Sequence, residues 1–208
     1  MALKKGQPTP PSHSPGERQD ARNLETLLQT LLDEDPSKRR WAARDLAEHP
    51  AATGALVSRL RRETDATVLQ VIVTALGCLA NDEAIRGLID CLYSENAMLR
   101  NTAIEVLKEL PDPVAPHMGE LLHDADPDVR IFAVNVLESL RHPQVEAWLV
   151  EVILKDEHIN VCATAVDLLG EVGGPQSRDA LAALKQRFPE EPYIQFAADL
   201  ALKRIGVE

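Results

Sequence analysis

Residues 124–140 read DADPDVRIFAVNVLESL, a short polar turn followed by a helical stretch. The turn is rich in aspartate and contains a proline, and these residue types cap helices and begin their first turn. Behind the turn, apolar residues stand at Val129, Ala133 and Leu137, a four-residue spacing that places them on one face of a helix. The stretch therefore predicts an amphipathic helix that starts at the proline.

The same pattern occurs six times along the chain. When the six segments are aligned, the column of Val129 contains Lys38, Val68, Leu99, Val129, Val161 and Ile194. The column four residues on contains Ala42, Ile72, Ala103, Ala133, Ala165 and Ala198, and the column eight residues on contains Leu46, Leu76, Leu107, Leu137, Leu169 and Leu202. These leucines recur at intervals of 30, 31, 30, 32 and 33 residues. A period in this range is typical of stacked repeat proteins.

A second apolar segment precedes each of these helices, for example VEAWLVEVIL at residues 145–154. Each unit is therefore expected to be a helical hairpin, which buries its apolar stripe only by stacking on other hairpins. The sequence predicts an all-α fold, an α-solenoid of about six stacked helical hairpins, over residues 23–208. The hairpins are expected at residues 23–49, 50–80, 81–111, 112–141, 142–173 and 174–206.

Two further columns predict the direction of stacking. Five residues after the reference column stand Ala43, Val73, Ile104, Val134 and Val166, followed in the last unit by Asp199. Because this flank becomes acidic only there, we expect it to face the next hairpin and Asp199 to mark the C-terminal end of the array. Trp41 lies on the opposite flank, and we expect the helix around Leu24 to cover it.

The composition narrows the class of protein. The formal net charge is −11, which repels phosphate backbones over most of the surface. Residues 1–22 are rich in Pro, Ser and Gly and are expected to form a disordered tail. The sequence contains neither an apolar stretch of signal-peptide length nor a run that could span a membrane. Its three cysteines show no metal-binding spacing, so we expect reduced thiols in a cytoplasmic protein.

The pattern D-x-x-V-R-x-x-A-x-x-x-L, unbroken from Asp126 to Leu137, resembles a HEAT-type repeat. The period of about thirty residues resembles the bacterial type known as PBS-lyase-like HEAT repeats. The resemblance covers roughly residues 23–205 and implies a superhelical array that serves mainly as a binding scaffold. It also implies a ladder of Asp–Arg contacts between neighbouring hairpins, formed here by Asp35, Asp65 and Asp126 with Arg39, Arg100 and Arg130.

The motifs that would indicate catalysis or a metal are missing from the sequence. Deoxyhypusine hydroxylase, an enzyme built from HEAT repeats, binds iron through His-Glu dipeptides, whereas this chain has only the reverse order, at Glu48-His49 and Glu157-His158. The acidic run at residues 124–128 lacks the glycine and the distal glutamate of a calcium loop. We therefore expect no catalytic residue, no cofactor and no metal site.

One cluster of basic residues could indicate nucleic-acid binding. It comprises Lys38, Arg39, Arg40, Arg44, Arg59, Arg61 and Arg62. The same region, residues 33–65, also contains seven acidic residues, namely Asp33, Glu34, Asp35, Asp45, Glu48, Glu63 and Asp65. This balance favours a solvated surface of mixed charge over a nucleic-acid interface.

The face of the second helices opposite the core stripe is the best candidate for function, because in HEAT proteins these helices line the concave side. The candidate partner-binding residues on it are Arg40, Arg44, Glu105, Ile131, Asn135, Glu138, Asp167, Phe196 and Leu200. The face is basic at one end, acidic in the middle and apolar at the other end, which suits a protein segment. The apolar pair, Phe196 and Leu200, either contacts such a segment or a second copy of the chain, or packs under the C-terminus with Val207.

The sequence thus leads to three hypotheses of function. The first is a non-catalytic scaffold or adaptor that holds a segment of another protein on its concave face. The second, which follows from the resemblance to phycobilin lyases, is a lyase or chaperone for tetrapyrrole chromophores. The third, less favoured, is a nucleic-acid-binding protein.

Overall fold

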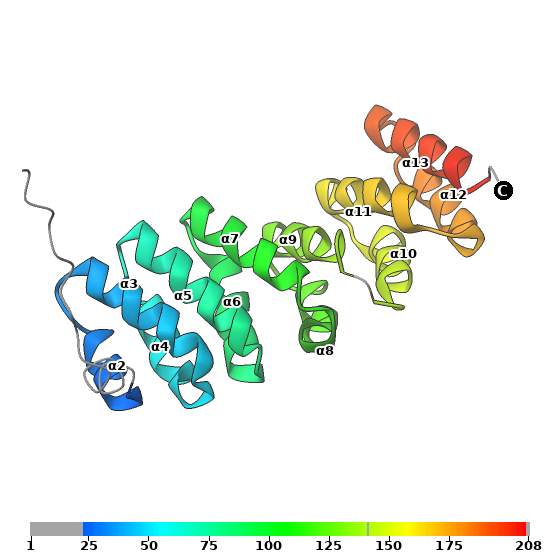
Figure 1. The fold of residues 1–208 in the computed structure, drawn as a ribbon. Coiled ribbons are helices and arrows are strands. Elements are labelled where there is room, and N and C mark those ends of the chain that lie inside the picture. Colours follow the sequence, from blue (N-terminus) through cyan, green and yellow to red (C-terminus); the bar gives the residue numbers. More distant parts are fainter. Residues whose placement is uncertain (1–22, 141, 207–208) are drawn as a thin grey trace, which may run out of the picture.

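The structure is a computed structural model, and it describes residues 23–140 and 142–206. These residues form twelve α-helices and four short 3-10 helices, without any strand. The helices follow one another along an elongated array (Figure 1). The predicted all-α solenoid is confirmed. The tail predicted for residues 1–22, and Val207, lie outside the described residues.

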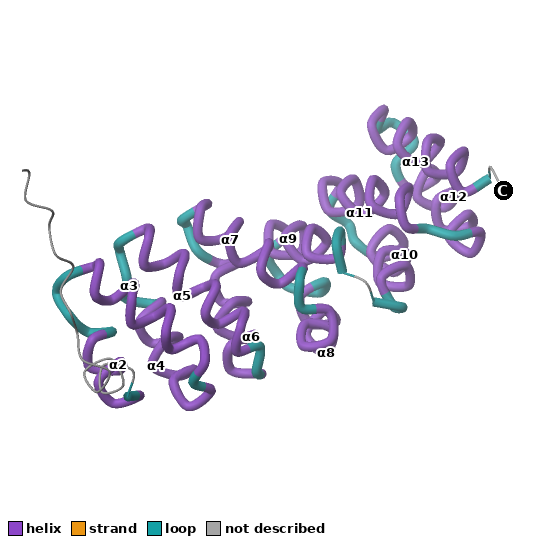
Figure 2. Tube along the Cα trace, in the orientation of Figure 1, coloured by secondary structure: helices purple, strands orange, loops and turns teal. Residues whose placement is uncertain are grey.

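The helices alternate between two rows, so that each hairpin contributes one helix to each row (Figure 2). The first helices are α2 (Leu24–Thr30), α4 (Thr53–Leu60), α6 (Asp82–Asp90), α8 (Pro111–Leu121), α10 (Val145–Lys155) and α12 (Arg178–Arg187). The second helices are α3 (Pro36–Asp45), α5 (Ala66–Leu79), α7 (Ala97–Lys108), α9 (Pro127–Leu137), α11 (Ile159–Val172) and α13 (Pro192–Ile205). Each second helix packs against the second helix of the next hairpin. The 3-10 turns are η1 (Leu46–Glu48), η2 (Pro50–Ala52), η3 (Cys91–Tyr93) and η4 (Pro175–Ser177).

Polar residues at the turns determine where the second helices begin. Asp35, Asp65, Asn96 and Asp126 precede α3, α5, α7 and α9, and the side chain of each accepts a hydrogen bond from a backbone N–H of the first helical turn. Such caps satisfy amide groups that have no partner inside the helix. Proline also stands at the start of α3, α9 and α13, where its missing N–H removes no helical bond.

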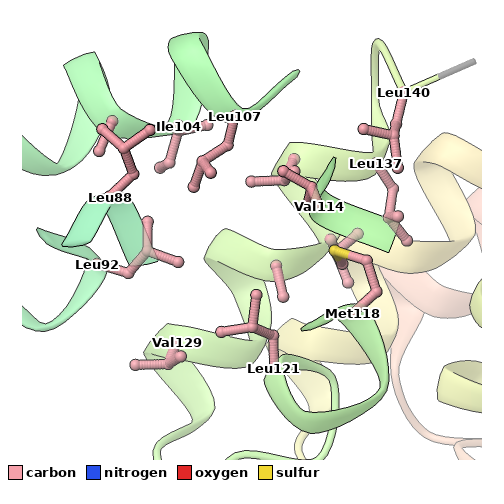
Figure 3. Packing of buried hydrophobic residues seen from close by; sticks show 14 of the residues in the cluster. Leu88, Leu92, Ile104, Leu107, Val114, Met118, Leu121, Val129, Leu137 and Leu140 are labelled. Atoms are coloured by element: carbon pink, nitrogen blue, oxygen red, sulfur yellow. The ribbon is translucent and has the colours of Figure 1, made fainter. Parts of the chain in front are cut away.

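The aligned columns form the core, as predicted. All six residues of the second column, from Ala42 to Ala198, are fully buried. In the central hairpins, Leu107 and Leu137 of the third column lie among Val114, Met118 and other buried residues of the first-helix row (Figure 3). Lys38 is the exception in the reference column, because its ammonium group is exposed and pairs with Asp33 at 2.9 Å.

The predicted direction of stacking is also confirmed. Ala43, Val73, Ile104, Val134 and Val166 are buried, whereas Asp199 is exposed and forms an ion pair with Lys185. At the other end, α2 packs against α3, and Trp41 is half-buried against the core. The array therefore ends in a polar flank at α13, and at its other end α2, the first helix of hairpin 1, packs beside the helix that carries Trp41.

The predicted Asp–Arg ladder is wrong in its acidic partners. Asp35, Asp65 and Asp126 are occupied as caps of their own helices. Arg39 instead pairs with Glu63 at 2.8 Å, and Arg130 pairs with Asp156 at 2.6 Å. Both acidic residues stand two positions before the N-cap position of the second helix of the following hairpin, which is Asp65 in one case and His158 in the other.

Arg100, the third arginine of the expected ladder, forms no such pair. Its Nη1 donates to the carbonyl of Ser94 at 2.6 Å, and its Nε is buried without a hydrogen-bond partner among the described residues. The corresponding acid of the next hairpin, Asp124, accepts a hydrogen bond from the hydroxyl of Tyr93 at 2.6 Å instead. The ladder therefore joins hairpin 1 to 2 and hairpin 4 to 5, but not hairpin 3 to 4.

Candidate partner-binding face

The candidate face is the exposed side of the second-helix row, which we call the second-helix face. At its N-terminal end, Arg40 and Arg44 of α3 are both exposed, and Arg44 pairs with Asp45 at 3.2 Å. They lie three hairpins away from the candidates on α9, so the structure does not bring these two groups together.

The basic residues around this end are largely paired with acids. Arg39 and Arg59 both bind Glu63, and Arg61 binds Asp90 at 2.7 Å. The charges of the two signs therefore neutralise one another locally, as expected for a surface of mixed charge.

Three of the predicted residues line one groove between α9 and α11. Asn135 and Glu138 come from the end of α9 and Asp167 comes from α11, and Thr164 and Glu171 complete the wall. The groove has a volume of about 260 Å³. We call it the acidic groove, because its charged lining residues are all carboxylates.

Glu105 of α7 is joined to this groove through Lys108. The ammonium group of Lys108 lies 2.7 Å from Glu138 and 3.2 Å from Glu105. The hydrogen bond to Glu138 is the main reason why the pKa of Lys108 is raised above its usual range. One lysine thus neutralises one edge of the groove, whereas Asp167 and Glu171 have no ion pair with any residue of 23–140 or 142–206.

The exposed side of α13 carries large apolar residues next to the acidic groove. Phe196 is 66% exposed, Leu200 is 38% exposed, and Tyr193, one turn before Phe196, is 53% exposed. The hydroxyl of Tyr193 donates to Asp167, and this bond raises the pKa of Tyr193. We call these three residues the apolar strip. By contrast Ile131, which was also predicted on the face, is half-buried and packs against the core.

Another hollow, of about 310 Å³, lies between α8 and α10 in the first-helix row. Its lining includes Trp148, which stacks on His142 with ring centroids 5.1 Å apart. Several of its charged residues are paired within the chain, since Arg130 binds Asp156 and Glu151 contacts both Lys155 and His123. The hollow therefore carries charges of both signs, whereas the charged lining residues of the acidic groove are all carboxylates.

The side chains that could do covalent or metal chemistry are dispersed. Within the described residues, no three His, Cys, Asp or Glu side chains gather in a way that could hold a metal ion. Burial raises the pKa of Cys91 to about 12 and that of Cys162 to about 11, which keeps both thiols protonated at neutral pH. None of the helices between residues 23 and 206 has the length and apolarity that a membrane span requires.

Stacked helical hairpins with one continuous core define the class of this protein, an α-solenoid repeat protein. A family model described as HEAT repeats matches residues 115–203. Residues 115–203 are therefore similar to HEAT repeats. No curated protein matches it.

Solved structures with the same kind of fold include the archaeal HEAT-like repeats protein from Thermococcus onnurineus NA1. It is 18% identical, with a TM-score of 0.50 over 91% of this chain and 92% of that one. Human deoxyhypusine hydroxylase is 16% identical, with a TM-score of 0.48 over 94% and 86% of the two chains. The complex of CpcE and CpcF of phycocyanin lyase from Nostoc sp. PCC7120 is 18% identical, with a TM-score of 0.39 over 99% of each. At this level of identity the likeness shows the fold alone.

Sequence reasoning missed several residues of the site. Tyr193 stands three residues before Phe196 and therefore on the same helical face, so the spacing alone could have revealed it. Thr164 and Glu171 line the acidic groove from positions outside the columns assigned to the face. They could not be found without knowing how α9 and α11 pack, because the groove lies between the helices.

Proposed function

We propose that this protein is a non-catalytic scaffold that holds a segment of a partner protein on the second-helix face of hairpins 4 to 6. The observation that carries the proposal is the exposure of Phe196 and Leu200 beside the acidic groove. Apolar side chains of this size are costly to leave in water, and when they cluster next to a polar groove they commonly mark an interaction site.

The composition of the face also supports a protein segment as its ligand. Protein interfaces combine an apolar centre rich in aromatic residues with a polar rim. Tyr193 and Phe196 supply aromatic surface, while Asn135, Glu138 and Asp167 supply hydrogen-bonding groups beside it. The shallow groove between two helices fits a narrow chain better than it fits a folded domain.

An unbiased peptide-display selection against the full chain tests this proposal. Selected peptides are expected to bind the wild type and to lose binding in the double variant Phe196→Ser, Leu200→Ser. Each of these side chains can contribute about 1.5–3 kcal/mol when it is buried in an interface. The double variant should also keep the helix content and melting temperature of the wild type, since both side chains are exposed.

The matched control removes two exposed leucines that lie off this face, through Leu32→Ser and Leu154→Ser. The control should retain peptide binding. Two results would overturn the proposal: selection yields no peptide, or both double variants bind the selected peptides as the wild type does. A dimer in light scattering that dissociates in the Phe196, Leu200 variant would assign the strip to a second copy of the chain and also overturn it.

A further inference from the structure

The acidic groove carries charge that the described part of the chain leaves uncompensated. Glu138, Asp167 and Glu171 contribute three carboxylates, and Lys108 neutralises part of this charge through Glu138. Asp167 accepts a hydrogen bond from the neutral hydroxyl of Tyr193, which neutralises no charge. Because a carboxylate can accept about four hydrogen bonds, Asp167 can still bind a cationic donor.

Tyr193 also fixes the position of this carboxylate. Its ring belongs to the apolar strip on α13, while its hydroxyl holds Asp167 on α11. The aspartate is thereby kept at the boundary between the acidic groove and the apolar strip. A bound chain that reaches Asp167 therefore meets an apolar surface directly beside it.

The dimensions of the site limit what can occupy it. The groove of about 260 Å³ admits one long side chain rather than a folded surface. Packed helices lie about 8–10 Å apart, so the middle of the groove between α9 and α11 is roughly 12–15 Å from α13. An extended chain advances about 3.3 Å per residue and covers that distance in about four residues.

We propose that the bound segment contains a basic residue and an apolar residue about four positions apart. Its lysine or arginine occupies the acidic groove, and its apolar side chain contacts Phe196 and Leu200. This inference rests on the proposed function and adds the chemistry of the ligand. Charge complementarity carries it, because a cation satisfies Asp167 and Glu171 whereas an acidic or neutral segment leaves both carboxylates uncompensated.

The test uses fluorescence polarisation with the full chain at about 0.15 M salt, where long-range attraction is screened. The probe is a labelled Gly/Ser peptide of about twelve residues in which one lysine and one leucine stand four positions apart. Two matched probes replace the lysine by glutamate or the leucine by serine. The Lys–Leu probe should bind at least about tenfold more tightly than either matched probe.

Two charge variants separate this site from attraction to an acidic protein in general. Asp167→Asn with Glu171→Gln should weaken binding of the Lys–Leu probe about tenfold. Asp112→Asn with Glu120→Gln on α8 removes the same charge from exposed positions in the first-helix row and should leave binding unchanged.

Equal losses in both charge variants, or no measurable binding of the Lys–Leu probe, would overturn the inference. So would display-selected peptides that depend on Phe196 and Leu200 but carry no basic residue, and in that case the proposed function would stand. If selection yields no peptide at all, the proposed function and the inference fail together.

Discussion

Arg39 of the first hairpin and Glu63 of the second form a two-pronged ion pair, with Nε–Oε2 and Nη2–Oε1 distances of 2.8 Å each. The Glu63 side chain is fully buried, and it also accepts hydrogen bonds from Arg59 and from the backbone N–H groups of Thr64 and Asp65. Burial opposes the ionisation of this carboxyl, but the hydrogen bonds outweigh burial and lower its pKa to about 2.

Replacement of Glu63 by glutamine should destabilise the protein strongly at pH 7. The variant leaves Arg39 buried without its counter-ion, and breaking a buried pair costs roughly 3–5 kcal/mol. Urea unfolding followed by circular dichroism measures this free energy. The control is Asp90→Asn, which breaks the exposed pair with Arg61 and should cost less than about 1 kcal/mol. Equal losses in the two variants would contradict the role assigned to Glu63.

The same carboxylate predicts a dependence of stability on pH. Since the pKa of Glu63 is lower in the folded chain than its ordinary value of 4.5, its contribution is complete above pH 4.5 and is lost as the pH falls toward 2. The difference in unfolding free energy between wild type and Glu63→Gln should therefore shrink over this range. A difference that stays constant down to pH 2 would contradict the lowered pKa.

Val129 and Lys38 occupy the same column of the repeat, yet substitutions at the two positions should differ sharply in effect. Val129 is 1% exposed, so Val129→Asp buries an unpaired charge and should lower the free energy of unfolding by roughly 4 kcal/mol. Lys38→Ala removes only an exposed ion pair and should cost less than about 1 kcal/mol. Thermal melts of both variants test this contrast, and a Val129→Asp melt within a degree or two of wild type would overturn the assignment of the column.

Two helical glycines should respond in opposite ways to alanine. At Gly77 on α5, an added Cβ atom would clash with Cγ1 of Val106 on α7, so the Val106 side chain or the helix that carries it would have to shift. At Gly119 on α8, an added Cβ atom meets no atom within 4 Å. Alanine is more favourable than glycine inside a helix by about 0.5–1 kcal/mol, so Gly119→Ala should raise the melting temperature. Gly77→Ala should lower the melting temperature. A higher melting temperature for both variants would show that α7 shifts at little cost to accommodate the added methyl group.

The fold could be predicted because its determinants are local and repeated six times. The buried position of Ala133 recurs in every hairpin, so an error in one segment is corrected by the other five. The change from Val166 to Asp199 even revealed which flank faces the next hairpin. These features follow from helical periodicity and burial, which depend on sequence spacing alone.

The ion pairs and the site could be predicted only in part, because they depend on distances between hairpins. The resemblance implied Asp65 as an acidic residue of the ladder, but Asp65 caps α5 and Glu63 pairs with Arg39 instead. Ile131 was expected on the exposed face, but the packing of α9 half-buries it. A rotation of a helix by a fraction of a turn decides such cases, and the sequence does not specify it.

The interrupted ladder has a mechanical consequence. Hairpins 1 and 2 are fixed to each other by Arg39 and Glu63, hairpins 4 and 5 by Arg130 and Asp156, and hairpins 5 and 6 by the hydrogen bond from Arg187 to the carbonyl of Asp156. Leu69 stands in the arginine column of hairpin 2, and Arg100 makes no ion pair with any described residue. Single-point links cross the two central joints instead, such as Arg61–Asp90 between hairpins 2 and 3, and Lys108–Glu138 and Tyr93–Asp124 between hairpins 3 and 4. Apolar contacts have no preferred direction and a single-point link allows rotation about it, whereas a two-pronged ion pair fixes an angle. Under tension or compression we therefore expect the array to bend more easily between hairpins 2 and 4 than at its two ends.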